Sequence, residues 1–137
     1  MSRIIGIDYG FKRTGIAVTD PMKMIASGLE TIPTAVLFDY LKNYINQEEV
    51  ECIVFGMPTR DDGSPSEPVP QIIGAMRKCR KLFPGIRVES VDESYTSKMA
   101  FQTMIDGGVR MKKRRDKALV DKISATIILQ SYMEHNC

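Results

Sequence analysis

Three acidic residues, Asp8, Glu93 and Asp121, lie where a carboxylate could do chemistry. Asp8 ends a short apolar run and is bracketed by glycines in the stretch GIDYG. Asp121 shares an otherwise largely apolar helical stripe with Ala125 and Tyr132, at a position where a core residue is expected. Glu93 follows a segment that alternates like a strand. Because a carboxylate that loses hydration needs a compensating partner, these residues are candidate metal ligands and catalytic groups.

A divalent cation is the partner that three convergent carboxylates would favour. If they lie within about 5 Å, each pair repels by roughly 3 kcal/mol at an effective dielectric constant of about 20. Oxygen ligands without Cys or His favour Mg²⁺ first and Mn²⁺ second, and such ions keep waters that can attack a phosphate. We therefore predict that Asp8, Glu93 and Asp121 bind one or two of these ions.

A basic run, RMKKRRDK, precedes Asp121 and concentrates positive charge in a chain whose net charge is only +2. Local charge density attracts polyanions more than total charge does. A phosphate backbone held there would be delivered beside the carboxylates, and Lys12 and Arg13 would approach from the other side. The predicted nucleic-acid-binding residues are Lys12, Arg13, Arg110, Lys112, Lys113, Arg114 and Arg115.

Each of these features has a structural alternative. Asp8 could bind the backbone amides of the tight turn that follows it. Asp121 could lie at a helix flank and pair with Lys117 or Lys122. Glu93 could be a solvated turn residue or part of a helix-capping network, and the basic run could be a solvated loop.

Other chemistries lack the residues that they need. The three cysteines, Cys52, Cys79 and Cys137, are widely spaced without a CxxC pair, and His135 is the only histidine. We expect no zinc site, a core position for Cys52 and an incidental surface position for His135. No Cys or Ser has a base in an identifiable motif, and neither a GxxxxGK[ST] loop nor a GxGxxG turn is present.

Length and composition indicate a single soluble domain over residues 1–137. The chain is 43% hydrophobic and 26% charged, which is typical of globular proteins. Its first twenty residues lack the pattern of a signal peptide, and no apolar run reaches the roughly 18 residues of a membrane span. We expect a reduced, cytoplasmic protein that does not associate with membranes.

Periodicity predicts an α/β fold with a mixed five-stranded sheet. The predicted strands are 3–8, 14–19, 24–32, 52–55 and 86–92, and the predicted helices are 34–49, 69–83, from 96 or 97 to 107, and 117–134. The first two strands form an antiparallel hairpin. Right-handed crossovers make the first, fourth and fifth strands parallel, so Asp8, Gly56 and Asp92–Glu93 should share one edge of the sheet.

Four motifs in order give the chain a family resemblance. They are GIDYGFKRTGIAVTD, VFGMPTRDDGS, VDESYTS and DKISATIILQ. Together they resemble the YqgF or RuvX-like family, described as pre-16S rRNA nucleases and Holliday-junction-resolvase-like proteins, over nearly the whole chain. One departure is that the family often has Arg after the Glu, where this chain has Ser94, and Tyr95 replaces a commonly aliphatic residue.

The resemblance implies a ribonuclease-H-like fold and metal-dependent phosphodiester hydrolysis, with the acidic positions of the family falling on Asp8, Glu93 and Asp121. The implied substrate is structured nucleic acid, either precursor rRNA or branched DNA, with maturation of the 16S rRNA 5′ end as the favoured role. Ribosomal particles are a further candidate partner. Selectivity would come from nucleic-acid shape, because backbone contacts carry little sequence information.

Three alternatives remain open at this point. The chain could be a Holliday junction resolvase, or a non-catalytic module that binds nucleic acid or the ribosome. The third is an actin-like ATPase, whose phosphate motif also lies near a hairpin. Its site forms between two such domains, whereas 137 residues suffice for one.

Overall fold

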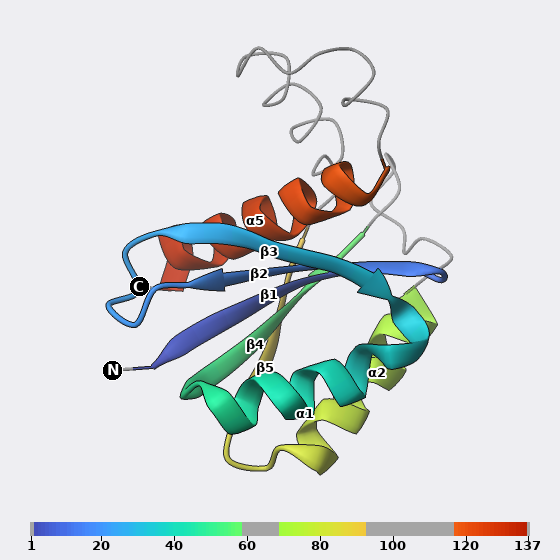
Figure 1. Ribbon diagram of the computed structural model, residues 1–137, viewed down its shortest axis with the longest axis horizontal. Helices are drawn as coiled ribbons and strands as arrows, with labels where there is room; N and C mark the ends of the chain where they lie inside the picture. The colour runs from blue at the N-terminus through green and yellow to red at the C-terminus, as the bar shows by residue number, and fades with distance from the viewer. Residues whose placement is uncertain (1, 59–68, 93–116, 137) are drawn as a thin grey trace.

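The computed structural model describes residues 2–58, 69–92 and 117–136 of the 137-residue chain. These residues form a five-stranded sheet with helices on both faces (Figure 1). The order across the sheet is β3-β2-β1-β4-β5. The strands are β1 (Arg3–Tyr9), β2 (Arg13–Thr19), β3 (Ala26–Pro33), β4 (Val50–Met57) and β5 (Arg87–Asp92).

The directions of the strands confirm the predicted mixed sheet. Antiparallel pairing joins β1 to β2 and β2 to β3, whereas parallel pairing joins β1 to β4 and β4 to β5. The register places Ile7 opposite Phe55, and Met57 opposite Asp92. The carboxyl ends of the three parallel strands therefore share one edge, and Asp8 lies at that edge with Asp92.

Helices enclose the sheet from both sides (Figure 1). On one face lie η1 (Thr34–Val36), α1 (Leu37–Gln47) and α2 (Val69–Leu82), and on the other lies α5 (Lys117–Asn136). Alternation along β1 divides the core accordingly, because Ile5 and Ile7 belong to the cluster with α1 and α2, whereas Ile4 packs with α5. The predicted apolar stripe of α5 is buried against the sheet, through Ala125, Ile128, Leu129 and Tyr132.

The third strand begins later than predicted, at Ala26 instead of residue 24. The carboxylate of Asp20 accepts hydrogen bonds from the backbone amides of Met22, Met24 and Ile25, at 3.1, 2.8 and 2.7 Å. These bonds, above all the one from Ile25, lower the pKa of Asp20. Because Asp20 organises a turn around these amides, the strand starts only beyond them.

The other elements match the predictions apart from their ends. The helix predicted over 34–49 begins with the 3₁₀ turn η1, and Glu48 is already extended. The fourth strand is longer than 52–55, and α2 and α5 begin at the predicted residues. The helix predicted from 96 or 97 to 107 lies outside the described residues. Within the ranges that the structure describes, no helix has the length and apolar character needed to cross a membrane.

Candidate active site

Glycines in neighbouring strands allow the backbone of α5 to lie directly on the sheet. A Cβ atom placed on Gly6 would lie 2.8 Å from Cβ of Leu129 and 3.0 Å from the carbonyl oxygen of Ala125. A Cβ atom placed on Gly15 would lie 2.5 Å from the carbonyl carbon of Asp121, and closer still to its oxygen. A side chain at either position would hold the helix away from the sheet.

This close contact carries Asp121 to a position adjacent to Asp8. Gly15 is the direct cross-strand partner of Asp8 in the ladder between β1 and β2. Asp8 lies on the α5 face of β1, because side chains alternate and Gly6, two residues earlier, touches α5. Ala125 lies over Gly6, and Asp121 is about one helical turn, or about 6 Å, from Ala125 along α5. Asp8 is two residues from Gly6 along β1, which is a similar distance. Asp121 is therefore placed next to Asp8.

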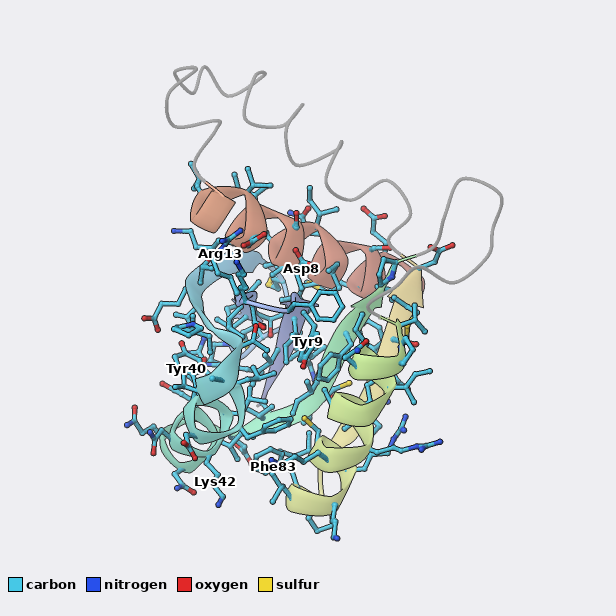
Figure 2. The ribbon with its side chains drawn as sticks, turned by 90° about the vertical axis from the view of Figure 1, so that its right-hand side faces the viewer. Asp8, Tyr9, Arg13, Tyr40, Lys42 and Phe83 are labelled. Atoms are coloured by element: carbon cyan, nitrogen blue, oxygen red, sulfur yellow. The ribbon has the colours of Figure 1, made fainter. Side chains whose placement is uncertain are left out.

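Arg13 forms an ion pair with Asp121 across the interface between β2 and α5. Its Nε donates a hydrogen bond to Oδ2 of Asp121 at 3.1 Å. The two side chains are 42% and 24% exposed, so solvent screens the pair and its contribution to stability is about 0–1 kcal/mol. In Figure 2, Asp8 and Arg13 both lie beside α5, whereas Tyr9 lies towards α1 and α2. The ion pair thus joins a predicted phosphate-binding cation to a predicted metal ligand.

The turn that carries Lys12 and Arg13 is fixed by Thr34 of η1. The hydroxyl of Thr34 donates to the carbonyl of Gly10 at 2.6 Å and, in consequence, accepts from the buried hydroxyl of Thr14 at 2.8 Å. The amide of Thr34 also donates to the carbonyl of Lys12 at 3.0 Å. The backbone at the base of the Arg13 side chain is therefore held in place, although the side chain itself reaches solvent.

The described residues bring together one part of the predicted site. Arg13 contacts Asp121 at the carboxyl edge of the sheet, Asp8 lies beside them as the cross-strand partner of Gly15, and Lys12 is in the adjoining turn. Among the residues that the structure describes, no three His, Cys, Asp or Glu side chains form a group that could hold a metal ion. The remaining predicted residues lie outside the described ranges; they are Glu93, Arg110, Lys112, Lys113, Arg114 and Arg115.

Asp121 forms an ion pair with Arg13, which its structural alternative does not include. Lys122 does not pair with it, and the side chain of Lys117 lies outside the described part of the structure. Lys122 lies over β3 instead, since a Cβ atom placed on Gly28 would meet its Cγ at 2.6 Å. The cation that reaches Asp121 comes from Arg13, 108 residues away in the sequence. Among the described side chains, Asp121 therefore has its charge compensated by Arg13 of β2 and not by Lys122 of its own helix.

The donor atoms at this edge fit a hard divalent cation. Asp8 and Asp121 offer carboxylate oxygens, which Mg²⁺ and Mn²⁺ prefer. Arg13 occupies Oδ2 of Asp121, so a metal ion would bind the other oxygen or displace the guanidinium. The described cysteines do not compete, because Cys52 and Cys79 are buried in the two cores, where burial raises the pKa of their thiols to about 11 and about 12.

Sequence reasoning missed two contributors to this geometry. The close contact of α5 with Gly6 and Gly15 had a usable signal, since glycine within a strand often marks the approach of another backbone. The pairing of Arg13 with Asp121 had no such signal, because it depends on how α5 docks.

The sheet and its flanking helices form a ribonuclease-H-like fold. The solved structure of Thermus thermophilus RuvC in complex with a Holliday junction substrate matches with a TM-score of 0.59, covering 99% of this chain and 97% of that chain. A second Thermus thermophilus RuvC structure matches with a TM-score of 0.56, covering 97% and 96%. Sequence identity is 16% in both cases, so the likeness concerns the fold.

The chain belongs to the RuvX family. The family model, described as "RuvX: Holliday junction resolvase", matches residues 2–135. A relative from Flavobacterium johnsoniae is 54% identical over 133 residues, which cover 97% of this chain and 96% of the relative. A relative from Bacteroides fragilis is 52% identical over 134 residues, covering 98% and 97%. Both relatives bear the name "Putative pre-16S rRNA nuclease".

Proposed function

We propose that this RuvX-family chain is a metal-dependent nuclease that hydrolyses phosphodiester bonds in structured nucleic acid. The observation that carries the proposal is the convergence of Asp8 and Asp121 on one face of the sheet, made possible by Gly15. Two acidic groups in adjacent positions are poorly suited to bind a polyanion unless a cation intervenes. The family and the fold support the same class of reaction.

Asp8 and Asp121 would hold the divalent cation, with Glu93 as a third ligand. Glu93 comes directly after Asp92 in the sequence, and Asp92 ends β5 at the same carboxyl edge of the sheet as Asp8. When bound, Mg²⁺ or Mn²⁺ supplies Lewis-acid activation of water and neutralises charge on the scissile phosphate.

The other residues of this edge would hold the nucleic-acid backbone. Lys12 and Arg13 project from a turn whose backbone Thr34 fixes, which favours a reproducible position for the phosphate. The basic run that contains Arg110 and Arg115 is proposed to supply further phosphate contacts. These contacts are independent of sequence, so selectivity would come from the shape of the nucleic acid.

Precursor 16S rRNA, cleaved near its 5′ end, is the substrate that we propose first. The support is the name shared by relatives that are more than half identical to this chain and of nearly the same length. Resolution of a Holliday junction is the second candidate, because the description of the matching family model names it.

The test is cleavage by purified protein of a precursor 16S rRNA fragment, a four-way DNA junction and single strands, with Mg²⁺ or with excess EDTA. We expect Mg²⁺-dependent cleavage, with the RNA preferred. Asp8→Asn and Asp121→Asn should each slow cleavage by roughly 100-fold or more, equivalent to about 2.7 kcal/mol of activation free energy.

Asp39→Asn is the matched control, since Asp39 is an exposed carboxylate of α1 on the opposite face of the sheet. It should cleave at the wild-type rate. Cleavage that survives EDTA, or that survives in Asp8→Asn, would rule out the proposed site. Preference for the four-way junction would select the second candidate, and binding without cleavage of any substrate would select a non-catalytic module.

A further inference from the structure

The side chain of Arg13 is tied to the site by a single contact. Within the part of the chain that the structure describes, its hydrogen bonding is limited to the one from Nε to Oδ2 of Asp121. The terminal nitrogens of the guanidinium and the second oxygen of the Asp121 carboxylate therefore have no hydrogen-bond partner among the described residues. A guanidinium presents five donors in a fixed fork, a geometry suited to carboxylates and phosphates alike.

The backbone beneath Arg13 is held far more firmly than its side chain. Arg13 pairs with Pro33 in the ladder between β2 and β3, and the hydrogen bonds of Thr34 hold the preceding turn. The side chain is 42% exposed. Rotation of the side chain can therefore exchange the Asp121 carboxylate for another anion without any rearrangement of the fold.

A divalent cation and Arg13 would compete for the same carboxylate. Oδ2 of Asp121 accepts the hydrogen bond from Arg13, and Asp121 is also one of the two described candidate ligands. A screened ion pair between partly exposed groups is weak enough for a doubly charged ion to displace. Once displaced, the guanidinium would remain at the carboxyl edge of the sheet, where the phosphate is expected.

We propose that Arg13 is a positioning residue that neutralises Asp121 when the metal is absent and is released to the phosphate backbone when the metal binds. The inference rests on the proposed function, since it takes Asp121 as a metal ligand. It adds that metal binding and nucleic-acid binding are coupled through one side chain. Such coupling must be reciprocal, so each ligand should raise the affinity for the other by the same factor.

The first test is a titration with Mn²⁺, following the free ion by its electron paramagnetic resonance signal. Arg13→Gln removes the competitor and should bind Mn²⁺ about fivefold more tightly than wild type, the factor that corresponds to about 1 kcal/mol for an exposed ion pair. Lys12→Gln is the matched control, because it removes the same charge one residue away. It should change the affinity by less than about twofold, since only screened long-range electrostatics is affected.

The second test measures binding of a short RNA with EDTA and with Ca²⁺, which limits turnover during the measurement. The cation should strengthen RNA binding by wild type more than by Arg13→Gln. In Arg13→Lys the cation should strengthen RNA binding by an intermediate amount, because lysine keeps the positive charge but lacks the forked donors of the guanidinium.

Asp121→Asn separates the inference from the proposed function. If Asp121→Asn leaves Mn²⁺ affinity unchanged, the metal site fails and this inference fails with it. If Asp121→Asn weakens Mn²⁺ binding but Arg13→Gln binds Mn²⁺ no more tightly than wild type, the metal site stands and the competition is refuted. Weaker binding by Arg13→Gln would show that Arg13 instead orients Asp121 for the metal.

Discussion

Replacing Gly15 with Ala should damage both the fold and the site, because α5 lies directly on this glycine. The added Cβ atom would lie 2.5 Å from the carbonyl carbon of Asp121, whereas ordinary contacts begin at 3.4 Å. The backbone must move by more than the difference, 3.4 − 2.5 = 0.9 Å, because the carbonyl oxygen of Asp121 lies closer still to the added atom. Overpacking of a well-packed interior typically costs about 1–3 kcal/mol, and displaced backbone belongs at the upper end, so we expect about 3 kcal/mol.

Urea denaturation followed by circular dichroism measures this loss. With a slope of about 1.5 kcal/mol per molar urea, a loss of about 3 kcal/mol lowers the midpoint by about 2 M. Gly28→Ala should cost less, because the nearest atom is Cγ of the flexible Lys122 side chain. Gly74→Ala is the control, since its Cβ atom would meet nothing within 4 Å and the helix α2 should gain about 0.5–1 kcal/mol.

The graded order of these three variants is the informative result. An unchanged midpoint for Gly15→Ala would contradict the close contact between α5 and β2, and with it the basis for placing Asp121 beside Asp8. A loss for Gly74→Ala as large as that for Gly15→Ala would show that the effect is not specific to the contact.

Two further predictions concern buried groups. Ser124 is buried, and its hydroxyl has no hydrogen-bond partner among the described residues. Ser124→Ala should therefore raise the free energy of unfolding, measured by urea denaturation, by about 1 kcal/mol. A decrease of similar size in the free energy of unfolding would show that the hydroxyl has a partner. Burial raises the pKa of the Cys79 thiol from 9.0 to about 12, so the unfolded state ionises first as the pH rises. The free energy of unfolding should therefore fall above pH about 9, and fall less in Cys79→Ala; identical pH profiles for the two proteins would contradict the raised pKa.

The sequence predicts the succession of strands and helices along the chain, the antiparallel hairpin of β1 and β2, and the parallel direction of β1, β4 and β5, because hydrophobic alternation and right-handed crossovers leave few arrangements. It also singles out Asp121, since a carboxylate within a buried stripe conflicts with its neighbours. The start of β3 could not be predicted because the amides of Met24 and Ile25, which the apolar pattern assigns to a strand, donate hydrogen bonds to the side chain of Asp20. The pairing of Arg13 with Asp121 escapes prediction because 108 residues separate the two, and only the docking of α5 brings them together.

The most direct test of the account is where a divalent ion binds on the folded protein. Substoichiometric Mn²⁺ broadens the amide signals nearest to it in a ¹H–¹⁵N correlation spectrum, and a chain of 15.4 kDa is well suited to this measurement. We expect the signals of Asp8, Gly15 and Asp121 to broaden first, while that of Lys42 on the opposite face stays sharp, and we expect the effect to vanish in Asp121→Asn. Broadening centred on another acidic position, such as Glu51, would contradict the proposed site.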